Sequence, residues 1–528
     1  MFDYAVRNAT VVDGTRRKPY QANIYISGDT IAEITAEERE ASRGFDAAGL
    51  VAAPGFIDIH THSDATFLST PTHEGKLLGG VTFELAGQCG ISLVPVTAQT
   101  RDENVYSITK PFLIEPTEAE FPAHDFAGYV KAVRERGISI NFGSMVGHGS
   151  LRSCIVGYEN RQMTDKELDA MCALLAEQLD QGALGVSFGL IYPPGSFCDT
   201  KEVVALARVA ASRNKVLAVH MRNENARVFE ALDEMIAVAR ETGVKLEISH
   251  LKLMGQAQWG RAQELLNKID LARAQGVRIH ADQYPYCASH SALKSCFPKW
   301  STEGGTAGFL SRLKDDATWA KITENGLPEM EARGGAARIN VSSTNGLFPE
   351  IEGMSLPEVA GYLKLPLLDG IREALIRCNG TISCIYHSIS RADMLTIMAR
   401  RDVCAASDGR AYPLDAKLGK VHPRNSSTFV RFLRTVREER LMPLEDAVYK
   451  ITALPATLLG LDDELGYIKV GHKANLTIFN AQTVTDTATY AEPIRRPEGI
   501  KQVIVNGQVV LDHSAITEAR PGKFYDRA

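Results

Sequence analysis

The sequence has 528 residues, of which 45% are hydrophobic and 23% are charged, and its formal net charge is −6. This composition is typical of a soluble globular protein, and the length suits one large domain with a smaller domain beside it. The acidic balance gives no electrostatic reason to expect a nucleic-acid partner. No run of about 20 apolar residues is present, so we expect no segment that spans a membrane.

The nine cysteines are odd in number and scattered along the chain. Their spacing indicates neither a disulfide framework nor a four-cysteine zinc site, and most should be small buried side chains. The first residues, MFDYAVRNATVVDG, lack the basic start and the uninterrupted apolar run of a signal peptide. We therefore expect a cytoplasmic protein, and the sequence leaves its oligomeric state open.

The two ends of the chain have the same character. Residues 1–53 and 465–528 contain short alternating apolar runs, such as ANIYISGDTIAEI and IKQVIVNGQVV, separated by Asn/Gly and Asp/Gly turn signals. Neither end has enough residues for a stable sheet by itself. We therefore predict one small β-sandwich domain that both termini build together.

The long middle part, residues 54–464, has a different sequence pattern. Short apolar runs such as VTFELAG, LGVSFGL and VLAVHM alternate with segments of helical period such as TDKELDAMCALLAEQLDQG. Strands and helices that alternate at this spacing are typical of parallel βα units. About eight such units predict an α/β fold with a TIM-like (β/α)8 barrel. A doubly wound open sheet is the alternative, but no Gly-rich phosphate-binding turn supports it.

One stretch interrupts this alternation. Residues 293–379 form a long mixed segment before the apolar run TISCIYH. We interpret it as an insertion on a late βα loop. Insertions at that face of a barrel often cover the active site.

His60 and His62 lie in the segment GFIDIHTHSD. Residues two apart on a strand face the same side, so both imidazoles would point the same way at the carboxyl end of that strand. Barrel enzymes build their active sites at this end. The pair therefore predicts a metal site rather than two unrelated histidines.

Three more residues follow apolar runs in the same way. His220 ends VLAVH, His250 ends KLEISH and Asp408 comes after VCAAS. The two histidines are one βα unit apart, so adjacent strands would offer them at the same end of the barrel. Imidazole nitrogens and a carboxylate form a ligand set that suits zinc or a similar divalent ion.

Cys89 lies in FELAGQCG, directly after the second barrel-like strand. This position predicts a thiolate ligand, which favours zinc over magnesium or manganese. His148 in MVGHG and His387 in CIYHS also follow apolar runs. They are candidates for groups that support the ligands or the oxyanion, and each would equally suit a hydrogen-bonded histidine near the barrel mouth.

The motifs occur in an order that resembles one family. PGFIDIHTHSD, GVTFELAGQCGISLVP, VGHGSLR, GLIYPPG, HMRNE, SHLK, DQYPY, ASDG and HPR resemble the D-aminoacylases, which are the N-acyl-D-amino-acid deacylases of the amidohydrolase superfamily. The resemblance extends over nearly the whole chain. The HTH element alone would indicate only the superfamily.

The resemblance implies roles for particular residues. A tightly bound zinc ion would have three ligands, namely Cys89, His220 and His250. A second, weaker metal position would be formed by His60, His62 and Asp408, with Cys89 able to bridge and Asp408 also the catalytic acid/base. The substrate carboxylate and amide would be held by Tyr192, Lys252, Tyr284 and Arg424.

The sequence departs from its relatives in places that concern specificity. No lysine stands in LGVSFGLIY, where hydantoinases carry the carboxylated lysine that bridges two metals, so that subtype is disfavoured. His290 stands where D-aminoacylases usually have a small hydroxyl residue, and the insertion is long. An acidic substrate side chain would need an extra cation near the pocket, and Lys294 or Arg222 could serve. The preferred side chain stays open.

The sequence thus predicts a zinc-dependent hydrolase of small-molecule N-acyl-D-amino acids, which it would cleave to a carboxylate and a free D-amino acid. Zinc would lower the pKa of a bound water to about 7, and the resulting hydroxide would attack the amide carbonyl. Asp408 would accept the proton and deliver it to the leaving nitrogen. The alternatives are a dipeptidase or a cyclic-amide hydrolase on the same scaffold, and a barrel homologue without catalytic activity.

Overall fold

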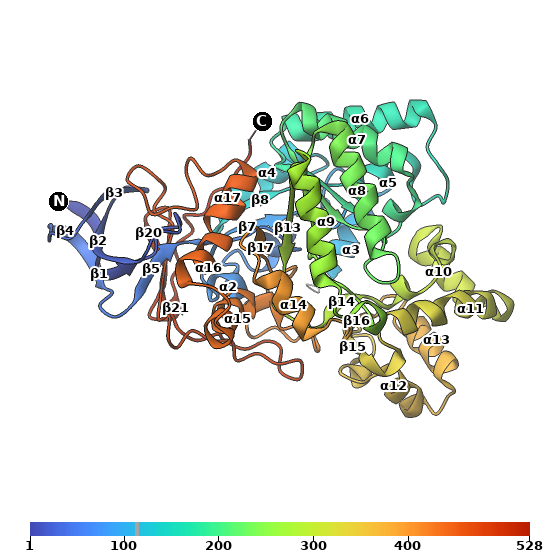
Figure 1. Ribbon diagram of the computed structural model, residues 1–528. Coiled ribbons are helices and arrows are strands. Elements are labelled where there is room, and N and C mark those ends of the chain that lie inside the picture. Colours follow the sequence, from blue (N-terminus) through green and yellow to red (C-terminus); the bar gives the residue numbers. More distant parts are fainter. Residues whose placement is uncertain (111–115, 528) are drawn as a thin grey trace.

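The structure is a computed structural model that describes residues 1–110 and 116–527, and its fold is mixed α/β, as predicted (Figure 1). Strands from both ends of the chain form one nine-stranded sheet, at the left of Figure 1. Strand β18 pairs antiparallel with β5 and so joins the two ends. The strands are β1 (Phe2–Val11), β2 (Tyr20–Ser27), β3 (Thr30–Thr35), β4 (Ala41–Asp46), β5 (Val51–Pro54), β18 (Leu476–Phe479), β19 (Ile500–Val505), β20 (Gln508–Asp512) and β21 (Ala515–Ile516).

This sheet has an apolar core of its own. Val6 and Ile24 from the N-terminal strands pack with Leu476 and Ile504 from the C-terminal strands, and all four side chains are fully buried. Branched aliphatic side chains suit a buried sheet face, and burying each contributes about 1.5–3 kcal/mol. The core therefore depends on both ends of the chain.

Parallel strands make up the centre of the molecule, in two sheets of order β6-β7-β8 and β9-β10-β11-β12-β13-β17. Only Met145 separates β8 from β9, and its backbone N–H donates to the carbonyl of Ala86 at the end of β7. A parallel bridge joins Thr61, beyond β6, to Gly409, beyond β17. The strands are β6 (Phe56–Asp58), β7 (Val81–Ala86), β8 (Asn141–Ser144), β9 (Val146–Gly147), β10 (Gly185–Gly189), β11 (Val216–His220), β12 (Lys245–Ile248), β13 (Ile279–Gln283) and β17 (Val403–Ala405).

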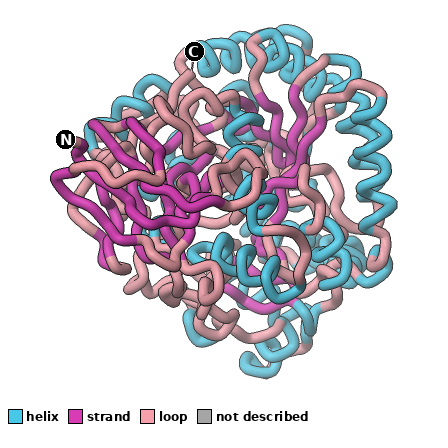
Figure 2. Tube along the Cα trace, turned by 60° about the vertical axis from the view of Figure 1, so that its left-hand side comes forward, coloured by secondary structure: helices cyan, strands magenta, loops and turns pink. Residues whose placement is uncertain are grey.

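Helices lie between these strands in the chain and outside them in space (Figure 2). In α6, a capping box of Thr164 and Glu167 begins the helix, and one apolar stripe, which includes Met171 and Leu175, is buried. The helices are α1 (Thr66–Ser69), α2 (Glu74–Leu77), α3 (Arg101–Thr109), α4 (Phe126–Arg136), α5 (His148–Val156), α6 (Asp165–Asp180), α7 (Thr200–Ser212), α8 (Val228–Thr242), α9 (Ala262–Ala274), α14 (Arg391–Met398), α15 (Arg424–Glu439), α16 (Leu444–Lys450) and α17 (Ala453–Leu459).

The segment between β13 and β17 carries extra structure, at the lower right of Figure 1. A small antiparallel sheet of order β14-β16-β15 has four helices beside it. The elements are β14 (Ser289–Ala292), a short 3-10 helix η4 (Leu293–Cys296), α10 (Gly305–Leu313), α11 (Asp316–Ala332), β15 (Ile339–Ser343), α12 (Leu356–Leu363), α13 (Leu367–Arg377) and β16 (Ser383–Tyr386).

Two further expectations concern the whole chain. Within the described residues, no helix combines the length and apolar character that a membrane span needs. All nine cysteines are free thiols.

Candidate metal centre

Cys89 lies among three imidazoles at the carboxyl ends of the parallel strands. Its sulfur is 3.4 Å from His60 Nε2, 3.4 Å from His250 Nε2 and 3.9 Å from His220 Nδ1. Cys89 follows β7, His220 ends β11 and His250 follows β12, so neighbouring strands bring these side chains together. All four are buried.

The groups around Cys89 affect the ionisation of its thiol. Burial alone would raise the pKa of Cys89, but the positive charges of His60 and His250 outweigh burial and hold the pKa well below its ordinary value. The thiolate is the form of cysteine that binds metals. The neighbouring positive charges therefore favour the form of Cys89 that binds metals.

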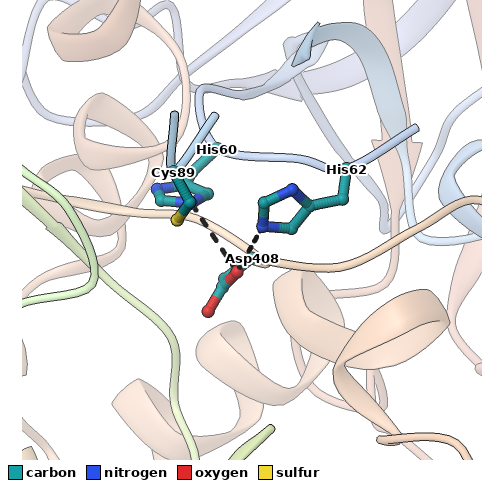
Figure 3. Close-up of side chains that lie close together, drawn as sticks. All are labelled: His60, His62, Cys89 and Asp408. Atoms are coloured by element: carbon teal, nitrogen blue, oxygen red, sulfur yellow. Dashed lines mark hydrogen bonds and ion pairs between the residues drawn. The ribbon is translucent and has the colours of Figure 1, made fainter. Parts of the chain in front are cut away.

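A second group of side chains adjoins the first (Figure 3). Asp408 Oδ1 lies 3.0 Å from His62 Nε2 and 3.6 Å from His60 Nε2. The parallel bridge between Thr61 and Gly409 holds the two segments side by side, which explains why residues 346 positions apart in the chain meet.

Asp408 also contacts a cation. Arg424, at the first position of α15, places Nη1 2.8 Å from Asp408 Oδ2. Burial opposes ionisation of this carboxyl, but the Arg424 and His250 charges hold its pKa well below the ordinary value. The Nη1 contact is an ion pair without hydrogen-bond alignment, and this buried donor has no hydrogen bond within the described residues.

Two buried carboxylates lie behind the imidazoles. Asp282 Oδ2 is 2.9 Å from His60 Nδ1. Glu224 places Oε1 3.0 Å from His250 Nδ1 and Oε2 3.4 Å from His220 Nε2. Each ring thus turns one nitrogen to a carboxylate and the other to Cys89. Carboxylates placed in this way fix the tautomer and orientation of histidines that bind metal.

Three of these residues have an unusual backbone. Cys89, His250 and Asp408 have φ angles of 53°, 39° and 50°, in the left-handed region that side chains other than glycine rarely adopt. Such conformations cost about 1–3 kcal/mol and persist where the surrounding structure determines them. They aim the three side chains at a common point.

The donor set fits a zinc centre. The ligand atoms of Cys89, His220 and His250 lie within 4.8 Å of one another, and so do those of His60, His62, Cys89 and Asp408. A thiolate with imidazoles and a carboxylate is a combination that zinc prefers. Because Cys89 belongs to both groups, it could bridge two ions.

The centre opens into a cavity of about 1100 Å³. Tyr192 and Tyr284 line it; the Tyr192 hydroxyl lies 3.3 Å from Ser291 Oγ, whereas the buried Tyr284 hydroxyl has no hydrogen bond within the described residues. Arg424 lies over the Tyr284 ring, 4.9 Å from its centroid. Lys252 also lines the cavity and donates a 2.5 Å hydrogen bond to Glu224.

The sequence pattern of the amidohydrolase family matches residues 43–321 and 378–511. This chain belongs to that family. It is 32% identical to the D-aminoacylase of Alcaligenes xylosoxydans xylosoxydans, over 100% of this chain and 98% of that protein. It is 34% identical to the N-acyl-D-glutamate deacylase of the same organism, with coverage of 99% and 96%. The resemblance to the D-aminoacylases is confirmed.

A solved structure of another such amidohydrolase agrees with this assignment. The N-acyl-D-glutamate deacylase of Bordetella bronchiseptica, complexed with zinc and a phosphonate inhibitor that mimics the tetrahedral intermediate, superposes with a TM-score of 0.84. The two proteins are 29% identical, and the match covers 100% of both chains.

The remaining histidines predicted from the sequence lie in three different places of this amidohydrolase. His290, on β14, lines the cavity and contacts Ser342 Oγ at 3.1 Å; burial lowers its pKa to about 3. His148 pairs with Glu202 at 2.6 Å, in a buried network with Arg152. His387 packs against the Tyr490 ring at 5.0 Å and does not line the cavity.

Sequence reasoning missed the two carboxylates that this amidohydrolase places behind its imidazoles. Glu224 follows His220 by four residues in HMRNE, and Asp282 ends the run IHAD. Asp282 lies at the end of β13, whereas Glu224 lies in the loop four residues beyond β11, and histidines that bind metal usually have such a carboxylate partner. The strand-end position that marks the candidate ligands therefore also marks Asp282, but it does not mark Glu224.

Proposed function

We propose that this chain is a zinc-dependent deacylase that hydrolyses the amide bond of small-molecule N-acyl-D-amino acids to a carboxylate and a free D-amino acid. One observation carries the proposal: the Cys89 thiolate belongs to two adjoining ligand groups, one of which includes Asp408 paired with Arg424. The relatives that are N-acyl-D-amino-acid deacylases support the same reaction.

The proposed scaffold is a TIM-like (β/α)8 barrel over residues 54–464. The Thr61–Gly409 bridge and the hydrogen bond from Met145 to Ala86 support closure of the two parallel sheets into one barrel. Residues 1–53 and 465–528 would form the β-sandwich domain. Residues 293–379 would be an insertion that covers the active site, and the family pattern leaves out most of it, 322–377.

In this proposal Cys89, His220 and His250 hold one zinc ion tightly, and His60, His62 and Asp408 provide a weaker position that shares Cys89. When bound, zinc activates a water molecule and polarises the amide carbonyl. The carboxylates of Asp282 and Glu224 orient the imidazoles behind it.

The chain's own groups would move the proton and hold the substrate. The lowered pKa of Asp408 favours its carboxylate form, which would accept the proton of the attacking water and then deliver it to the leaving nitrogen. Arg424 and Tyr284 offer buried donors that have no hydrogen bond within the described residues, which suits an α-carboxylate. Tyr192 and Lys252 line the same cavity and would complete this grip.

A substrate panel on zinc-loaded enzyme tests the proposal. We expect hydrolysis of N-acetyl-D-methionine or N-acetyl-D-glutamate and little hydrolysis of their L-enantiomers, a dipeptide or a hydantoin. Turnover of the dipeptide or the hydantoin alone would replace the proposal by one of those activities. Purified protein without bound metal and without activity after zinc addition would indicate a homologue that is not catalytic.

A further inference from the structure

Lys294 is a cavity-wall cation without an ion pair to any residue that the structure describes. Lys294 lies in η4, directly after β14, and lines the cavity that contains the metal centre. Within the part of the chain that the structure describes, its ammonium forms no hydrogen bond and no ion pair. Lys252, Arg424 and Arg333 line the same cavity and are paired with Glu224, Asp408 and Glu329.

An ammonium in this position is costly for the protein. Lys294 is accessible only partly, and burial lowers the pKa of its side chain, an effect that the Glu103 carboxylate only partly offsets. A charge that burial disfavours and that lacks an ion pair is stabilised by a ligand of opposite charge. An anion in the cavity would supply the missing counter-charge.

The cavity as a whole favours anions. Among the described residues, ten Lys or Arg and six Asp or Glu line it. This surplus of positive charge raises the local concentration of negatively charged ligands. Arg222, the other cation that an acidic side chain could meet, is already neutralised by Glu234 at 3.0 Å.

Lys294 is linked to the proposed substrate site along one wall. The Tyr192 hydroxyl lies 3.3 Å from Ser291 Oγ, and Ser291 Oγ lies 3.4 Å from Ser295 Oγ. Lys294 stands between these two serines in the chain, at the turn from β14 into η4. A substrate held at Tyr192 would therefore extend its side chain along the wall that carries Lys294.

We propose that Lys294 binds the side-chain carboxylate of the substrate and makes acidic N-acyl-D-amino acids the preferred substrates. This inference rests on the deacylase function proposed above. The α-carboxylate would remain with Arg424 and Tyr284, so the substrate would be held by two separate cations.

The test compares kcat/KM for N-acetyl-D-glutamate, N-acetyl-D-aspartate, N-acetyl-D-glutamine and N-acetyl-D-methionine. Wild-type enzyme should prefer an acidic substrate to the neutral glutamine analogue. Lys294→Met should lower kcat/KM for the preferred acidic substrate about ten- to a hundredfold, the usual effect of losing a hydrogen bond between ionised groups. The neutral substrates should be cleaved as by wild type, which also shows that the variant is folded. Lys294→Arg should restore part of the loss.

Lys299→Met is the matched control. Lys299 lines the same cavity, but its ammonium already donates to the Ser196 carbonyl at 2.9 Å, so its loss should not change the preference. If Lys294→Met and Lys299→Met lower kcat/KM for the acidic substrate equally, the inference is overturned, because the overall positive charge of the cavity would then explain the preference. A wild-type preference for neutral substrates would overturn it and leave the deacylase function intact. No hydrolysis of any D-substrate would contradict the deacylase function itself.

Discussion

Replacing Glu224 by Gln tests whether the buried carboxylates hold the metal centre together. Glu224 contacts His250 Nδ1 at 3.0 Å, His220 Nε2 at 3.4 Å and Lys252 Nζ at 2.5 Å. A glutamine keeps the shape of the side chain but has only one acceptor oxygen. At least one imidazole therefore loses its acceptor, and Lys252 loses its counter-charge.

The expected loss follows from these contacts. Removing a carboxylate behind a metal-binding histidine typically weakens metal affinity about 10–100-fold. Since Glu224 supports two proposed ligands, we expect zinc affinity to fall by about a hundredfold, or about 2.8 kcal/mol at about 1.4 kcal/mol per tenfold. Competition with a chromophoric zinc chelator measures this change directly.

The matched control is Glu234→Gln. Glu234 is a carboxylate on α8 that pairs with Arg222 and contacts none of the candidate ligands, so zinc affinity should stay at the wild-type value. If folded Glu224→Gln binds zinc as tightly as wild type, the carboxylate does not orient the ligands and the reasoning is refuted.

Three further predictions concern single residues. Cys89→Ala should lose zinc, as measured by plasma emission, because both candidate ligand groups need this sulfur; undiminished zinc would return Cys89 to the structural cysteines. Asp408→Asn should keep zinc at Cys89 and lower kcat about 10²–10⁴-fold, and normal turnover would exclude Asp408 as acid/base. Burial lowers the pKa of Lys450 from 10.5 to about 7 in the folded protein. Between these two pH values the unfolded chain binds more protons than the folded protein does. The free energy of unfolding should therefore rise with pH, by up to about 1.4 kcal/mol per pH unit. Thermal unfolding of wild type and Lys450→Met at pH 7.5 and 9 measures this rise, and parallel pH dependence of the two proteins would contradict it.

The positions of the candidate ligands could be predicted because each one follows a strand that can be recognised in the sequence. His60, His62, His220 and His250 each stand at or just beyond the end of a short apolar run, and parallel strands bring such ends together. Cys89 has the same signal. The structure places all of them, with Asp408, within two adjoining groups.

Partners across the molecule could not be read from the sequence in this way. Asp282 reaches His60 across 222 positions of the chain, and the pairing of Arg424 with Asp408 depends on where α15 begins relative to β17. These contacts follow from register and packing between elements, which local patterns do not encode. From the sequence, either Lys294 or Arg222 could bind an acidic substrate side chain. The structure distinguishes these two cations, because Arg222 already forms an ion pair with Glu234.

The central claim is that bound zinc makes this chain a deacylase of N-acyl-D-amino acids. Its most direct test measures the release of free D-amino acid from N-acetyl-D-glutamate and from N-acetyl-D-methionine by chelator-treated enzyme before and after zinc is restored. We predict no measurable release without metal and full recovery with zinc. Undiminished hydrolysis by the metal-free enzyme, or no hydrolysis by the zinc-loaded enzyme, would contradict the claim.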